Sequence, residues 1–157
     1  GFQFGVAAYD AMSIKDLTLQ AEWNNVSKGM YQHSNPQNDY KHYGGYLAHP
    51  TGNDLNELIG IVHYSFHDFF VSAKWVYSDR TSPVDVDLGN GSVLSYRESQ
   101  QVTYQDYSIG YLLNPKTNMK IKLGYSSRKL NRLSSSENTS WFYFSFITDL
   151  QNVYYDF

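Results

Sequence analysis

The residues best suited to chemistry lie in one polar stretch, from Tyr31 to about Asn56. It contains three histidines, His33, His42 and His49, and imidazole nitrogens are common zinc ligands. Structural zinc sites usually contain closely spaced pairs of ligands, whereas these histidines are separated by nine and seven positions. The spacing lacks the signature of a metal site, so we expect neither a metal nor another cofactor.

The same stretch suits carbohydrate binding. Aromatic rings can stack on the C–H faces of a sugar, while carboxylates and imidazoles form hydrogen bonds with its hydroxyl groups. The alternative is structural, because a long loop can also fold back into the molecule and hold itself there with the same side chains. For the binding hypothesis, the candidate residues are Asp39, Tyr40, His42, Tyr43, Tyr46 and His49.

The chain contains none of the common catalytic motifs. The patterns G-x-S-x-G and H-E-x-x-H are absent, as is a glycine-rich loop for binding phosphate. We therefore expect a protein that is not an enzyme.

The composition excludes several classes of protein. Of 157 residues, 15 are Tyr, 9 are Phe and 3 are Trp, the hydrophobic fraction is 41%, and there is no cysteine. A disordered chain would have few aromatic residues, a helical membrane protein would have runs of about 20 apolar residues, and a disulfide scaffold would need cysteines. The net charge of -3 gives no reason to expect nucleic acid as a partner, because phosphate recognition needs a basic surface.

Hydrophobic residues alternate with polar ones, which predicts an all-β chain. In the clearest example, Met119, Ile121 and Leu123 alternate with Lys120 and Lys122. Seven segments are predicted to be strands, with approximate bounds Phe2 to Asp10, Leu17 to Met30, Glu57 to Phe66, Phe69 to Ser78, Gln101 to Leu113, Asn118 to Arg128, and Ser140 to Thr148.

Each predicted strand has one apolar and one polar side, as in an antiparallel transmembrane β-barrel. A soluble sheet with one wet face would show the same alternation. In the barrel, the predicted membrane-facing residues are Trp23, Trp75, Tyr77, Tyr111, Met119, Ile121, Leu123, Phe142, Phe144 and Phe146. The predicted lumen-lining residues are Gln20, Glu22, Asn24, His63, Lys74, Asp106, Lys120 and Lys122, which either line a pore for charged solutes or satisfy one another.

The connections between the predicted strands alternate in length, as they do in bacterial barrels. Tight turns are expected at His67-Asp68 and over Asn114 to Thr117, and long loops over residues 31–56, 79–99 and 131–139. Counting back from a periplasmic C-terminus, we expect the long loops outside the cell and the short turns in the periplasm. The terminal aromatic Phe157 is also typical of outer-membrane proteins.

The sequence resembles the C-terminal part of a family of Bacteroidota outer-membrane barrels, the capsule-assembly Wzi-like and gliding-motility proteins. The matching segments are Leu17-Thr-Leu-Gln-Ala-Glu-Trp-Asn24, Asn38-Asp-Tyr-Lys-His-Tyr43, Leu47-Ala-His-Pro-Thr-Gly52, Asn56-Glu-Leu-Ile-Gly-Ile-Val62 and Thr148-Asp-Leu-Gln-Asn-Val-Tyr-Tyr-Asp-Phe157. They occur in the same order and span most of the chain, while residues 79–99 match poorly.

The resemblance implies one C-terminal segment, residues 1–157, of a larger barrel in the bacterial outer membrane. The implied partners are outer-membrane lipid, surface polysaccharide, and other outer-membrane, gliding or secretion proteins. Seven strands do not make the even number usual for such barrels, so the rest of the wall is expected from further sequence or another chain. The alternatives are a porin-like passive channel through the polar lumen and a soluble lectin-like β-sandwich.

Overall fold

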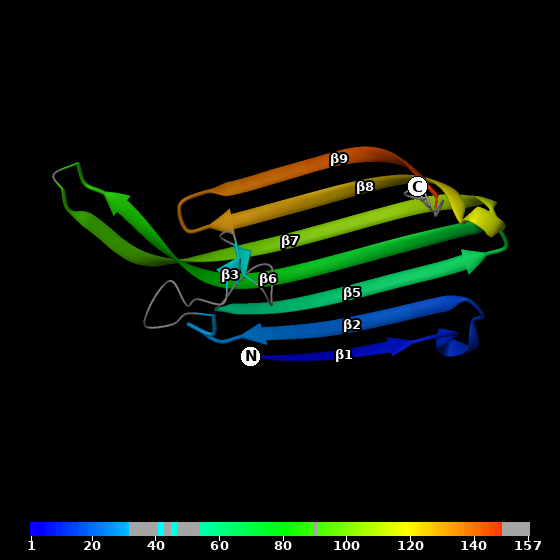
Figure 1. Cartoon of the computed structure of the whole chain (residues 1–157), viewed down its shortest axis with the longest axis horizontal. Coiled ribbons are helices and arrows are strands. Elements are labelled where there is room, and N and C mark those ends of the chain that lie inside the picture. The colour runs from blue at the N-terminus through cyan, green and yellow to red at the C-terminus, as the bar shows by residue number, and fades with distance from the viewer. Residues whose placement is uncertain (32–40, 43–44, 47–53, 90, 149–157) are drawn as a thin grey trace, which may run out of the picture.

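The computed structural model describes residues 1–31, 41–42, 45–46, 54–89 and 91–148. Seven strands lie side by side in one antiparallel sheet, in the order β1-β2-β5-β6-β7-β8-β9 (Figure 1). The prediction of an all-β antiparallel chain with seven strands is confirmed. The strands of this sheet are β1 (Phe2–Ala8), β2 (Leu17–Val26), β5 (Leu55–Phe66), β6 (Phe69–Asp87), β7 (Val93–Asn114), β8 (Met119–Arg132) and β9 (Ser136–Ile147).

Short elements complete the described structure. The strands β3 (Lys41–His42) and β4 (Gly45–Tyr46) pair with each other, and single 3-10 turns span Ala11–Ser13 and Pro115–Thr117. The two predicted tight turns are present. His67 has a φ of 54° in the turn between β5 and β6, and the Asn114 side chain accepts a hydrogen bond of 3.0 Å from the Lys116 N–H.

The prediction of a long loop over residues 79–99 is wrong. Strands β6 and β7 continue through this segment as a two-stranded ribbon that extends beyond the neighbouring strands, and only residues 88–92 connect them (Figure 1). Pro83 lies within β6, although proline lacks the backbone N–H of a ladder bond. It is accommodated because β5 pairs with β6 only as far as Arg80, so that Pro83 has a partner strand on one side only.

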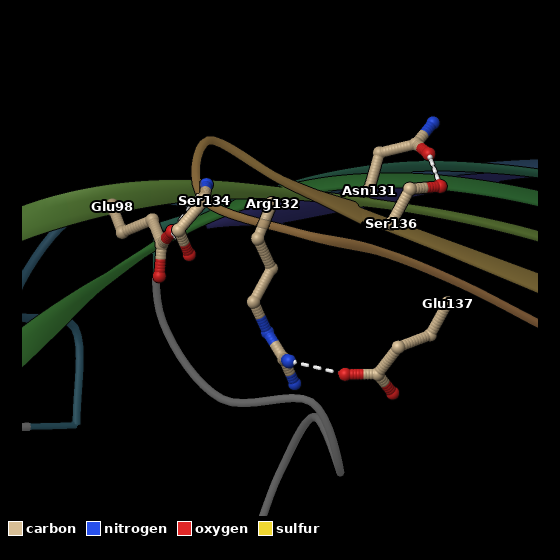
Figure 2. Close-up of polar contacts among 6 residues, drawn as sticks. All are labelled: Glu98, Asn131, Arg132, Ser134, Ser136 and Glu137. Atoms are coloured by element: carbon tan, nitrogen blue, oxygen red, sulfur yellow. Dashed lines mark hydrogen bonds and ion pairs between the residues drawn. The ribbon is translucent and has the colours of Figure 1, made fainter.

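The predicted loop over residues 131–139 is also mostly strand. Strand β8 runs to Arg132 and β9 begins at Ser136, which leaves a connection of three residues. Polar pairs close this hairpin, since Arg132 Nη1 donates to Glu137 Oε1 at 2.7 Å and Ser136 Oγ donates to Asn131 Oδ1 at 2.8 Å (Figure 2). The ends of β8 and β9 are mostly polar and are paired through polar side chains, so hydrophobic alternation did not predict that the strands continue there.

The seven-stranded sheet is a single layer with almost no apolar core. The buried hydrophobic residues of the described part are Ala11, Val26, Leu55 and Leu130, while residues such as Phe4 and Phe144 are 67% and 66% exposed. A β-sandwich would instead bury one face of each sheet against the other. The arrangement leaves one broad apolar face and one broad polar face.

Candidate functional site

The strand register decides which side chains share a face of the sheet. Residues opposite one another in neighbouring strands point to the same side. Lys74 lies opposite Ile61 and Asp106, and Ile61 lies opposite Gln20, so these side chains share one face. Alternation along the strands places the whole predicted lumen set on it, and we call it the polar face: Gln20, Glu22, Asn24, His63, Lys74, Asp106, Lys120 and Lys122.

The predicted membrane-facing residues lie on the opposite side, which we call the apolar face. Trp23 is opposite Leu58, which is opposite Tyr77, and Leu123 is opposite Phe144. The polar atoms of the tryptophans are occupied there. Trp75 Nε1 donates to the Tyr107 hydroxyl at 2.8 Å and Trp23 Nε1 donates to Asn56 Oδ1 at 2.5 Å. The full predicted set on this face is Trp23, Trp75, Tyr77, Tyr111, Met119, Ile121, Leu123, Phe142, Phe144 and Phe146.

Asp106 is the centre of a hydrogen-bond network on the polar face. The Tyr143 hydroxyl donates to its two carboxylate oxygens at 3.0 and 3.1 Å, the Tyr104 hydroxyl donates at 3.4 Å, and Ser126 Oγ donates as well. Ser126 is only 1% exposed. Three hydroxyl groups from three strands therefore hold this carboxylate. Alternation predicted that Asp106 lines the lumen, but it did not predict these three partners.

A second network joins two carboxylates across β2 and β5. Asn24 Nδ2 donates to Glu22 Oε1 at 2.9 Å and to Glu57 Oε1 at 3.1 Å, and Gln3 Nε2 donates to Glu22 Oε1 at 2.7 Å. Together with Lys74, these side chains line a concavity of about 770 Å³ in the polar face. The amides and carboxylates there offer both donors and acceptors to a polar solute.

The histidine on the polar face is held at both ring nitrogens. His63 Nδ1 lies 2.7 Å from Ser72 Oγ, and Nε2 lies 3.2 Å from Ser65 Oγ. With two serine hydroxyls and no carboxylate among its contacts in the described chain, His63 lacks the acidic partner of a catalytic triad.

Two lysines of β8 lie over aromatic rings of the neighbouring strands. Lys122 Nζ is 5.1 Å from the centroid of Tyr143, and Lys120 Nζ is 5.8 Å from that of Phe70. Both lysines are half-buried. Each ammonium group thus meets the electron-rich face of a ring.

Glycines on the polar face accommodate aromatic rings. Gly110 lies opposite Phe70, and Gly124 lies opposite Tyr143. A methyl group at Gly110 would lie 2.6 Å from Cε1 of Phe70, and one at Gly124 would lie 2.6 Å from Cε1 of Tyr143. Only glycine allows these close ring contacts, and they were missed because the sequence does not give the register that makes each pair.

Polar contacts also gather at the ribbon end of the sheet. Glu98, on β7, is only 5% exposed and accepts from Ser134 through the N–H at 3.4 Å and through Oγ at 3.1 Å (Figure 2). Arg97 forms an ion pair with Asp54, which precedes β5. These contacts tie the ends of β5, β7 and β8 together.

The candidate carbohydrate-binding residues lie mostly beyond the described part. Asp39, Tyr40, Tyr43 and His49 are outside the described residues, while His42 and Tyr46 belong to β3 and β4, where Lys41 lies opposite Tyr46. In the described ranges, no group of three or more His, Cys, Asp or Glu residues could hold a metal ion.

Within the same described ranges, no helix is long and apolar enough to cross a membrane. No family model, curated protein or solved structure matches the chain. The two faces of the sheet are therefore the structural features that bear on function.

Proposed function

We propose that the chain forms part of the wall of a transmembrane β-barrel in a bacterial outer membrane. In this arrangement the apolar face contacts lipid and the polar face contacts an aqueous interior. The observation that supports the proposal best is the shape of the apolar face, whose border with polar residues runs obliquely across the strands.

On each strand, the border is the apolar residue of the apolar face that lies nearest the ribbon end of the sheet. On β2, β5 and β6 it lies at the row Trp23, Leu58 and Tyr77. On β7, β8 and β9 it lies at the row Tyr107, Tyr125 and Phe142. Tyr77 is opposite Thr103, four residues from Tyr107, so the border moves four residues over the five steps from β2 to β9.

This displacement gives a tilt angle. Four residues advance about 13 Å along a strand and five strand spacings cover about 24 Å, so the border makes an angle of about 30° with the rows of paired residues. A membrane surface parallel to that border would have strands tilted by about 30° from its normal, close to the roughly 35–45° of outer-membrane barrels.

The width of the apolar face fits the same geometry. Its rows on β5 and β6, Leu58 to Phe66 and Phe69 to Tyr77, each cover nine residues. Eight steps of about 3.3 Å give about 26 Å along the strand and about 23 Å along the normal at this tilt, against roughly 25 Å for a typical apolar band. Aromatic residues mark its two borders, with Trp23, Tyr77 and Tyr107 at one and Phe66, Phe69 and Tyr111 at the other, as in the aromatic belts of membrane proteins.

The open edges indicate that more strands are needed. Strands β1 and β9 end the sheet, and because every pairing is antiparallel, the first and seventh strands run in the same direction. A barrel with only antiparallel pairs therefore requires an odd number of additional strands between β9 and β1. Unpaired backbone groups are costly in lipid, which favours closure by further sequence or another chain.

The biological role that we propose follows the family resemblance. The outside loops would engage surface polysaccharide or a partner of the gliding or secretion apparatus, without catalysis. Replacing Tyr40, Tyr43 and Tyr46 by alanine is expected to weaken retention of the surface glycan while the barrel still assembles. Unchanged retention would argue against the glycan hypothesis.

A passive channel is the second candidate, and the polar side chains of the polar face with its concavity of about 770 Å³ favour it. Conductance in liposomes separates the two roles. A channel should conduct in the intact protein, whereas a lumen closed by residues 31–56 should conduct only after that segment is deleted.

The proposal of a membrane barrel is tested by extraction. The full-length protein should remain with outer membranes in carbonate and leave them only in detergent. Release by carbonate alone would contradict it.

A further inference from the structure

The charges on the polar face are separated by sign. Within the part backed by the apolar face, β2 carries Glu22 on its polar side, Glu57 lies at the border of this part on β5, and neither strand has a lysine or arginine. On the same part of the polar face, β6, β7 and β8 carry three lysines, Lys74, Lys120 and Lys122, and one carboxylate, Asp106. We call the three lysines the lysine strip.

The carboxylate within the strip, Asp106, forms no ion pair with the lysines and leaves the strip with a net positive charge. Asp106 lies opposite Lys74, yet its oxygens accept from the hydroxyl groups of Tyr104, Ser126 and Tyr143. The ion pairs between described residues are Asp54–Arg97 and Arg132–Glu137, both at the ribbon end of the sheet. The three lysines therefore have no carboxylate partner within the described part of the chain.

Two of the lysines are also held in place. Lys120 and Lys122 are two residues apart on one face of β8, so their Cα atoms are about 7 Å apart along the strand. Each ammonium group lies over a ring, of Phe70 or Tyr143, and these contacts orient the charges without neutralising them. Both side chains are half-buried, so their positive potential is screened less than that of fully exposed lysines.

We propose that the lysine strip binds small multivalent oxyanions on the polar face. Within the proposed barrel the strip lines the interior, so this inference extends the proposed function to anionic solutes. Three ammonium groups on one face attract a solute carrying several sulfonate or phosphate groups more strongly than a monovalent one, because each added charge pair contributes to binding.

The test uses the full-length protein in detergent and the trisulfonated dye pyranine as probe, with binding followed by fluorescence anisotropy. The dye is expected to bind at low ionic strength and to be displaced by inorganic phosphate but not by glucose. Binding should fade at about 1 M salt, where the Debye length is about 3 Å. Absence of binding at low salt would overturn the proposal.

Matched variants separate the strip from general charge. The double variant K120Q/K122Q should weaken binding about tenfold, an order of magnitude set by the loss of two charge contacts. K120R/K122R should retain binding, because it keeps both positive charges. Lys129→Gln removes a positive charge from the same strand but from the side occupied by Thr103, the apolar face, and should leave binding unchanged. Equal losses in K120Q/K122Q and K129Q would refute the assignment to the strip.

Flotation of the same protein with phospholipid vesicles separates this inference from the barrel proposal. Flotation without dye binding would overturn the anion site alone. Dye binding without flotation would overturn the membrane barrel and leave the anion site standing.

Discussion

The substitution Leu123→Arg distinguishes a lipid-facing surface from a water-facing one. Leu123 is 59% exposed, lies within the apolar row of β8, and is paired with Ile109 and Phe144. If this face contacts the hydrocarbon region, arginine there should reduce the free energy of unfolding by about 2–4 kcal/mol. If the face contacts water, the same change at an exposed site should stay within about 0.5 kcal/mol.

The assay is urea unfolding of the protein refolded into phospholipid vesicles, followed by tryptophan fluorescence. Leu133→Arg is the matched control, because Leu133 is 90% exposed and lies in the connection between β8 and β9, outside the apolar face. We expect the control to change the free energy of unfolding by less than about 1 kcal/mol. Equal effects at Leu123 and Leu133 would refute the assignment of the apolar face to lipid.

Two further predictions concern the polar face. Gly110→Ala should destabilise the protein by about 1–3 kcal/mol because the added methyl group overlaps the Phe70 ring, whereas Gly5→Ala should be nearly neutral because its nearest contact would be 3.6 Å away. Denaturant titration of both variants measures the difference, and equal stabilities would contradict the ring-over-glycine packing. Asp106→Asn should cost about 1–3 kcal/mol in the same titration, since three hydroxyl donors lose a charged acceptor. A neutral Asp106→Asn would mean that the hydroxyl groups do not stabilise the fold through this carboxylate.

Much of the sheet could be predicted because apolar and polar residues alternate with a period of two along the strands. Met119, Ile121 and Leu123 alternate with Lys120 and Lys122, and the structure places the two sets on opposite faces. The turn after β7 could also be predicted from its residue types. Pro115 sets its own φ, and Asn118 adopts a φ of 48° that asparagine tolerates.

The ribbon and the β8–β9 hairpin could not be predicted in the same way. Along the ribbon the polarity is reversed, with Val84 and Val86 continuing the polar face and Asp85 and Asp87 continuing the apolar one. A hydrophobic pattern that changes sides within one strand looks like an interruption. The structure shows instead that the ladder continues past the end of the neighbouring strand β5.

The details of the candidate site depended on register. Alternation predicted that Asp106 lies on the polar face. Tyr104, Ser126 and Tyr143 surround it because of the register between β7, β8 and β9. A shift of one residue would turn Tyr143 to the other face. Such cross-strand groups require a pairing scheme, which alternation along one strand does not supply.

The contact between the apolar face and lipid is tested most directly by tryptophan quenching with brominated acyl chains. Trp23 and Trp75 lie on the apolar face, while Trp141 is opposite Ser126 on the polar face. In single-tryptophan variants refolded into brominated vesicles, we predict strong quenching at Trp23 and Trp75 and little at Trp141. Equal quenching at all three positions, or none at Trp23 and Trp75, would contradict the assignment of the two faces.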